Sequence, residues 1–432
     1  MKNLSGHPTN DRAEPHDAAG VHAVRRQLAE PIGALSQLGW LQNEAGESGE
    51  PQRIRDAVPL ARLDDLVFGG WDPSGEDLYT AARQAAVLDP ALLRALKTEL
   101  EDVRPMPAVF DSHYVPSLEG RHVVRVGGKA AMARAVMDDI ERFAERHRCD
   151  RLVMAWCGST EAYVELAAVH RHLDAFERGL REDDPAIASS MIYAYAALRL
   201  GVPFVNGAPN LCCDAPALVE LAMETGAPVA GKDFKTGQTL LKTILAPGLK
   251  ARALGVRGWF STNILGNRDG LVLDHPENCR TKQISKLGVL DSILPPGRDP
   301  ELYGSLEHRV SINYYPPHGD NKESWDNIDL FGWLGYPMQI KIDFMCRDSI
   351  LAAPVLLDLV LFSDLAARAG RHGVQDWLSF YFKSPQSVAG AEPEHDLFRQ
   401  QARLHDALRA MARAGAGAHG APGRLAAMAA AS

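Results

Sequence analysis

Apolar and polar positions form two different patterns along this chain. The first pattern covers residues 60 to 230. Short apolar runs alternate there with longer stretches of helical period. The run 151–157 (RLVMAWC) is continuously apolar, as is typical of a strand buried on both faces. Further strands are predicted within 60–72, 123–126, 203–205 and 227–230, and helices over 78–88, 90–100, 129–146, 188–200 and 215–225. The alternation predicts an α/β fold with a Rossmann-type doubly wound parallel sheet.

Beyond residue 230 the pattern changes to the two-residue period of half-exposed strands. The segments 307–315 (EHRVSINYY) and 338–344 (MQIKIDF) alternate as antiparallel strands do, and a polar turn at 319–322 lies between them. We therefore expect an inserted α+β domain over residues 231–345, built on an open sheet. Such a sheet has a face and edges to cover, which favours oligomer formation.

The two ends of the chain differ in texture from the rest. Residues 1–20 are polar and are predicted to be a disordered leader, so that the sheet domain covers 21–230. The strongly apolar helical segment 348–369 must be buried, and residues 346–400 are expected to return to the sheet domain. Residues 401–432 drift into Ala/Gly low complexity and are predicted to be a frayed tail.

The composition of the chain argues against several classes of function. The formal charge of −9 over 432 residues argues against a nucleic-acid partner, which normally requires a basic patch. No apolar run reaches the length of a membrane span and no signal peptide opens the chain, so no membrane partner is expected. The six cysteines lack CxxC spacing, which predicts reduced thiols and a cytoplasmic location. No metal site is expected, because the histidines and cysteines are not clustered.

Four lysines bracket a Gly/Asn/Asp-rich turn at 263–270; they are Lys235, Lys242, Lys282 and Lys286. Chemistry on phosphates or carbonyl groups needs cations at fixed positions, and a lysine can supply both charge and a tunable proton. Taken singly, each lysine can also be a solvated surface residue, since lysines are mostly exposed.

A series of short phrases lies along the chain: FGGWD at 68–72, VNGAPN at 205–210, KTGQT at 235–239, NILGN at 263–267 with Asp269-Gly270, KQISK at 282–286, Gly319-Asp320 and DSILAAP at 348–354. In this order they resemble the myo-inositol-phosphate synthase family, and they span about residues 22 to 390. The resemblance implies an NAD-binding Rossmann-type domain and a central α+β catalytic domain that mediates assembly of a homotetramer.

The family's reaction, by this resemblance, converts glucose 6-phosphate into an inositol phosphate on tightly held NAD, by oxidation at C5, enolisation, aldol closure and reduction. Its oxyanions and the substrate phosphate need fixed cations. The implied catalytic or phosphate-binding residues are Lys235, Lys242, Lys282, Lys286 and Lys383, with Asp320 as a carboxylate that orients a lysine. The implied NAD-site residues are Asp72, Ser159, Asn206 and Asp233. From the residues alone, Asp320 and Asn206 can equally be turn formers, and Asp72 a helix cap.

Two features depart from the family pattern, both on the cofactor side. The family opens with an apolar strand and a glycine-rich loop that lets backbone amides approach the pyrophosphate, and residues 1–20 contain neither. The first strand of the sheet is therefore expected to be missing. Either the strand and the glycine-rich loop that binds the pyrophosphate have been lost, or the true start lies upstream of Met1. The second departure is Lys232, where the family usually has an acid beside Asp233.

Three hypotheses about function follow from this resemblance and these departures. The first is an inositol-3-phosphate synthase. The second is a non-catalytic oligomeric homologue that binds a sugar phosphate. The third is a related NAD-dependent enzyme that acts on another polyol phosphate.

Overall fold

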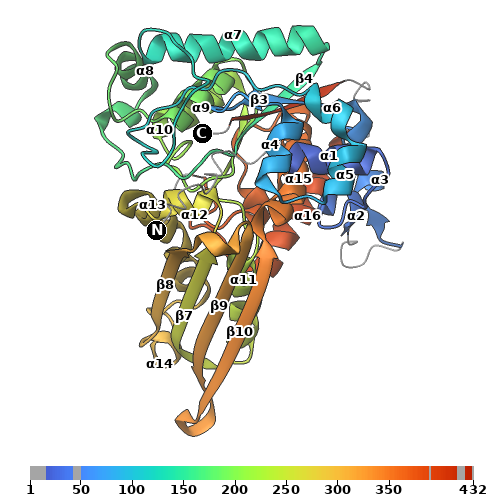
Figure 1. Ribbon diagram of the computed structural model, residues 1–432. Coiled ribbons are helices and arrows are strands. Elements are labelled where there is room, and N and C mark those ends of the chain that lie inside the picture. The colour runs from blue at the N-terminus through green and yellow to red at the C-terminus, as the bar shows by residue number, and fades with distance from the viewer. Residues whose placement is uncertain (1–15, 42–49, 389–390, 416–423, 431–432) are drawn as a thin grey trace, which may run out of the picture.

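Two sheets organise the protein. The computed structural model describes residues 16–41, 50–388, 391–415 and 424–430. A six-stranded sheet lies among most of the helices, and a four-stranded sheet extends away from it as an arm (Figure 1). The predicted α/β fold with an additional sheet domain is confirmed.

The six-stranded sheet is parallel throughout, with the order β11-β6-β5-β4-β12-β3. Its strands are β3 (Leu66–Trp71), β4 (Arg151–Trp156), β5 (Phe204–Asn206), β6 (Pro228–Gly231), β11 (Gly373–Val374) and β12 (Leu425–Ala430). The last four residues of β4 and all of β5 are buried, as their continuous apolar sequences predict.

Helices cover both faces of this sheet. On one face α7 (Lys129–His147), α9 (Ser189–Arg199) and α10 (Pro216–Thr225) form a core around Trp156 and Tyr193. On the other face α1 (His16–Arg25), α15 (Asp348–Arg368) and α16 (Leu397–Gly415) pack around Phe362. The smaller peripheral elements are α2 (Leu35–Leu38), β1 (Trp40–Leu41), β2 (Gln52–Arg53), α3 (Ile54–Ala57), α4 (Leu78–Ala85), α5 (Pro90–Ala95), α6 (Lys97–Glu101) and α8 (Leu173–Arg181).

The helix α15 is long and apolar enough, by length and composition, to cross a membrane. This differs from the expectation that no segment reaches that length. The helix contacts β4, β5 and β6 on one side and α1 on another, and most of its residues from Leu356 to Ala366 are buried. Its apolar sequence is therefore explained by its place in the core.

The arm contains four long strands in the order β10-β9-β7-β8. They are β7 (Gly255–Leu265), β8 (Glu307–Tyr314), β9 (Asn321–Phe331) and β10 (Pro337–Arg347), and the helices beside them are α11 (Gln238–Ala251), α12 (Arg268–Leu273), α13 (Pro276–Ile293) and α14 (Pro300–Tyr303). The predicted antiparallel pairing is right for β10 but wrong for β8, which runs parallel to β7. A two-residue period reports a half-exposed strand, not its direction.

Two predictions about the ends of the chain are wrong where the structure describes them. Residues 16–20 begin α1, whereas residues 1–15 of the expected leader lie outside the described residues. The expected frayed tail contains most of α16 and the strand β12, with residues 416–423 and 431–432 outside the described residues. β12 stands between β3 and β4, so the sheet has a central strand where one was expected to be missing.

Candidate active site

A polar cavity lies where the carboxyl ends of β4, β5 and β6 meet the base of the arm. Ligands of doubly wound sheets bind at this edge. The sheet contributes the loops 158–160, 207–209 and 233–236 to its walls, and the arm contributes Lys282 from α13 and Lys322 from β9. Segments far apart in the sequence therefore converge here.

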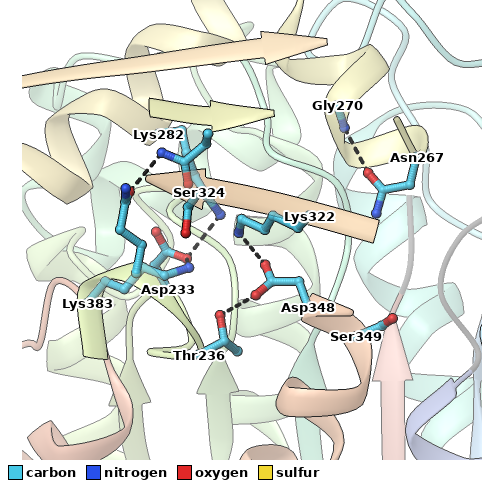
Figure 2. A network of polar contacts seen from close by, with 12 residues as sticks. Asp233, Thr236, Asn267, Gly270, Lys282, Lys322, Ser324, Asp348, Ser349 and Lys383 are labelled. Atoms are coloured by element: carbon cyan, nitrogen blue, oxygen red, sulfur yellow. Dashed lines mark hydrogen bonds and ion pairs between the residues drawn. The ribbon is translucent and has the colours of Figure 1, made fainter. Parts of the chain in front are cut away.

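Asp233 is the centre of this site. Its Oδ1 atom lies 3.1 Å from Nζ of Lys282 and 3.0 Å from Nζ of Lys383, and its Oδ2 accepts a hydrogen bond of 2.8 Å from Ser285 (Figure 2). Although burial opposes ionisation, the two ammonium groups hold the pKa of Asp233 well below its usual range. Burial likewise opposes charge on Lys282, but the Asp233 carboxylate raises the pKa of Lys282 above its ordinary value. Asp233 is therefore an ionised carboxylate whose Oδ1 atom pairs with the side chains of two lysines.

A second ion pair lies beside the first. Nζ of Lys322 is 2.6 Å from Oδ2 of Asp348, and Oδ1 of Asp348 accepts a hydrogen bond of 2.5 Å from Thr236. Burial opposes charge on both partners, yet each raises the ionised fraction of the other: the pKa of Lys322 lies above its ordinary value and that of Asp348 far below. Neither residue was predicted, although Lys322 follows the Gly319-Asp320 phrase and Asp348 opens DSILAAP.

Lys286 differs from the other lysines of the site. It is buried on α13, and it has no hydrogen bond or ion pair with any residue that the structure describes. Burial lowers its pKa well below the ordinary value, and the ammonium groups of Lys322, Lys383 and Lys282 lower it further. Because a lowered pKa favours the neutral amine, Lys286 is suited to accept a proton.

Lys242 lies behind this cluster, on α11. Its Nζ atom is 2.8 Å from Nε2 of His308, and it does not line the cavity. Burial lowers the pKa of Lys242 to about 8, with Asp326 opposing the shift, and burial beside Lys242 lowers that of His308 to about 3. Lys242 therefore does not contact the cavity, although its positive charge adds to the effect of burial in lowering the pKa of Lys286.

Lys235 is not brought into the cluster. Its Nζ atom donates a hydrogen bond to Gln400 of α16 and lies 5.5 Å from the centre of the Phe380 ring. Burial lowers its pKa to about 7, with Asp396 opposing the shift. Among the described residues, the Lys235 side chain has no polar contact with Asp233 or the other lysines of the site, because it is directed toward α16.

Asp320 forms no hydrogen bond or ion pair with a lysine in the part of the chain that the structure describes, which differs from its predicted role. It accepts hydrogen bonds from Asn267 at 3.1 Å and from Ser349 at 3.0 Å, and burial raises its pKa. Asp348 has the predicted role, as the partner of Lys322. Asp320 instead connects the loop after β7 to the first turn of α15, which fixes one wall of the cavity.

The predicted NAD residues lie in different places. Asp72 directly follows β3 and lines a largely apolar cavity, and Ser159 lines the polar cavity. Asn206 is fully buried and bonds to Asn210 O and Ala208 N, so it forms a turn, the alternative left open from the sequence. Asp233 lines the polar cavity together with Ser159, and its carboxylate pairs with Lys282 and Lys383.

Lys232 does not place a free charge beside Asp233. Its Nζ atom forms an ion pair of 2.6 Å with Oδ1 of Asp214. The Asp214 carboxylate therefore balances the positive charge that Lys232 adds at this position.

The apolar cavity adjoins the polar one, because Cys157 lines both. Its walls include Val21 of α1 and Gly70 of β3, with Asp72 at the carboxyl end of that strand. Apolar walls suit an adenine ring, and a carboxylate at the end of such a strand suits ribose hydroxyls. The residues present fit the adenosine half of a dinucleotide. The segment before α1, where the family has its glycine-rich loop, lies outside the described residues.

Comparisons with known proteins agree with this geometry. An NAD-binding family model described as Myo-inositol-1-phosphate synthase matches residues 17–409. The chain is 51% identical to inositol-3-phosphate synthase 1 of Bacteroides thetaiotaomicron, covering 91% of each chain, and 33% identical to inositol-3-phosphate synthase 1 of Oryza sativa subsp. japonica, covering 83% of this chain and 73% of that one. The crystal structure of inositol-3-phosphate synthase from Caenorhabditis elegans superposes with a TM-score of 0.84 at 26% identity, over 92% of this chain and 83% of that one. The chain belongs to the NAD-dependent myo-inositol-1-phosphate synthase family.

Proposed function

We propose that the protein is an inositol-3-phosphate synthase, an isomerase that cyclises glucose 6-phosphate to a myo-inositol phosphate. The observation that carries this proposal is that lysines line one cavity and a further buried lysine, Lys286, lies beside them on the helix that carries Lys282. Lys282 and Lys322 are held charged by carboxylates, whereas Lys286 is held toward the neutral state. Ring closure through an enolate requires both fixed positive charge and a proton acceptor.

The charged lysines serve the anions of the reaction. The substrate phosphate and the oxygen atoms of the enolate and the aldol alkoxide carry negative charge, which preorganised ammonium groups stabilise in a site that excludes water. Lys282 and Lys322, whose pKa values are raised, line the cavity, and so does Lys383, whose pKa is lowered by burial although Asp233 opposes the shift. Their partners Asp233 and Asp348 keep them in place before the substrate arrives.

The neutral amine of Lys286 serves the proton transfers. Enolisation removes a proton from C6 of the ketone; the amine of Lys286 accepts this proton and becomes an ammonium group beside the enolate. The proton then resides on Lys286, where it is available to the alkoxide formed in the aldol step. NAD, when bound, supplies the acceptor and later the donor of the hydride at C5. Asp72 and Ser159 are proposed to hold it.

An assay of the purified protein with glucose 6-phosphate and a catalytic amount of NAD tests the proposal. Because the hydride is returned, we expect inositol monophosphate to accumulate far beyond the amount of NAD, as followed by phosphorus NMR. A protein that binds NAD but forms no product would support the non-catalytic homologue, and turnover of a different polyol phosphate would support the third hypothesis.

We also propose that the protein is a homotetramer that assembles through the arm. The outer face of the arm exposes Phe260, Trp325 and Met345, whose exposed fractions are 40%, 39% and 64%. The turn between β9 and β10 exposes Trp333 at 88% and Tyr336 at 70%. Exposed aromatic side chains on a sheet that has a free face are typical of an interface. Light scattering after gel filtration should give four times the mass of one chain.

A cytoplasmic location completes the proposal. All six cysteines are free thiols, as suits a reducing compartment. Fractionation of cells that produce the protein should recover it with soluble cytoplasmic markers, and recovery with the exported fraction would contradict this location.

A further inference from the structure

The strand β12 (LAAMAA) pairs in parallel with β3 on one side and β4 on the other, over all six of its residues. Among the strands that the structure describes, β3 and β4 are joined in the sheet only through it. We propose that β12 is part of the NAD site: it forms one wall of the adenosine cavity, and docking of this strand and binding of NAD stabilise each other. The proposal rests on the use of NAD argued above and adds the segment that shapes the site.

Both ends of β12 are fastened to β4. The carbonyl oxygen of Arg424 accepts hydrogen bonds from the amides of Asp150 at 2.9 Å and Arg151 at 3.2 Å, and the Arg424 amide donates to Oδ2 of Asp150 at 2.8 Å. At the other end the amide of Cys157 donates to the carbonyl oxygen of Ala430 at 3.1 Å. These contacts fix the register, so each alanine of the strand has a defined face.

The two faces of β12 meet different surroundings. Ala426, Met428 and Ala430 are buried in the core beneath α7 and α9. Ala427 and Ala429 are only partly buried and line the apolar cavity. Partial exposure of a residue at the centre of a sheet indicates open space above it, and the small methyl groups of these alanines leave that space open for a ligand.

The neighbouring strand is shaped to receive β12. A Cβ atom added at Gly70 would lie 2.0 Å from the carbonyl oxygen of Ala429, a distance that no side chain tolerates. Glycine at this position therefore allows the close approach of the two strands. Gly70 lies two residues before Asp72, so the strand that presents the proposed ribose carboxylate is the one fitted against β12.

Mutual stabilisation follows from these contacts. Without β12, the strand that ends in Asp72 loses its connection to β4, which leads to Ser159. The cavity also loses the wall formed by Ala427 and Ala429. A ligand that binds only the docked arrangement favours it by mass action, by about 100-fold when its concentration is 100 times its Kd.

The first test uses the full chain with a matched pair of substitutions at one position. Ala429→Leu places a larger side chain in the cavity, and Ala429→Ser changes the size little. We expect Ala429→Leu to weaken NAD binding at least tenfold in calorimetry while thermal unfolding changes little, and Ala429→Ser to bind like the unaltered protein. Unchanged NAD affinity of a folded Ala429→Leu protein would overturn the proposal.

The second test keeps the proposal decidable if Ala429→Leu fails to fold. Hydrogen exchange of the unaltered protein is measured with and without saturating NAD. We expect the amides of β12 and β3 to exchange more slowly with NAD, and more so than those of β10 in the arm. Equal exchange of β12 in both conditions would contradict the role of the strand alone. Failure of the unaltered protein to bind NAD would contradict the cofactor assignment and the proposal with it.

Discussion

Lys322 and Asp348 join the base of the arm to the core helix, with Nζ of Lys322 2.6 Å from Oδ2 of Asp348. Lys322 is the second residue of β9 and Asp348 the first of α15, and both line the cavity between the sheet domain and the arm. The Lys322 side chain is 9% exposed and that of Asp348 25%, so removal of either partner leaves the other largely buried without this ion pair.

Asp348→Asn is therefore expected to reduce both stability and turnover. Loss of one partner of a buried pair costs about 3–5 kcal/mol, measurable by urea unfolding. The double variant Lys322→Met with Asp348→Leu should recover much of that stability because no unpaired charge remains, but it should not recover turnover. Recovery of turnover in the double variant would show that the pair is only structural.

Lys286→Met is expected to remove turnover without loss of stability. General acid–base catalysis by one group contributes about 100- to 10,000-fold, and kcat should fall by that order. The free energy of unfolding should stay equal or rise, because a buried amine crowded by Lys282, Lys322 and Lys383 is removed. Lys97→Met, the same change at an exposed lysine of α6, is the control for both measurements. A kcat within threefold of the unaltered protein would exclude Lys286 from proton transfer.

Lys235 gives a prediction about pH. Burial among Gln400, Phe380 and His395 lowers its pKa from 10.5 to about 7, although Asp396 opposes the shift. Between pH 7 and 10.5 the unfolded chain holds a proton on Lys235 that the folded chain lacks, so this contribution to stability rises with pH across that window. The free energy of unfolding of the unaltered protein minus that of Lys235→Met should therefore increase from pH 7 to pH 10 in urea titrations.

The same variant tests whether Lys235 touches the substrate. The Lys235 side chain packs against α16 and does not line the cavity. Turnover of Lys235→Met should therefore fall about tenfold or less, whereas turnover of Lys282→Met should fall about a hundredfold or more. Equal losses in the two variants would restore Lys235 to the catalytic set. If the difference in free energy of unfolding between the unaltered protein and Lys235→Met does not change from pH 7 to pH 10, the Lys235 amine is charged in the folded protein.

The sequence singled out lysines of the candidate site better than it predicted their partners. Lys282 and Lys286 stand in a recognisable phrase, but the pairing of Lys383 with Asp233 joins residues 150 positions apart. Periodicity carries no information on such contacts, because they depend on how β6, α13 and the loop after residue 382 come together. Lys322 escaped notice because it lies at the start of a strand that was expected to be a turn.

The strand β12 could not be predicted from its sequence for a different reason. Alanine has the highest helix propensity and a low preference for strands, so LAAMAA gives no local indication of a strand. Its conformation is determined by the gap between β3 and β4, where only small residues fit beside Gly70. Tertiary contact here overrides local preference.

The exposed face of the arm gives a prediction about assembly. Trp325 stacks near Phe260, with ring centres 6.0 Å apart, and both are partly exposed. Trp325→Glu places a charge in the proposed interface and should lower the mass found by light scattering to that of a dimer or a single chain. Trp325→Phe should keep the tetramer. A tetramer in both variants would place the interface elsewhere.

In the proposed reaction, hydride removal and return at C5 enclose a proton abstraction at C6 within one active site. Glucose 6-phosphate labelled with deuterium at C5, or with two deuterium atoms at C6, tests this order of steps by mass spectrometry of the product. We expect that the inositol phosphate keeps the C5 label, because the hydride returns to its carbon, and loses one of the two C6 labels to water. Loss of the C5 label, or retention of both C6 labels, would contradict it.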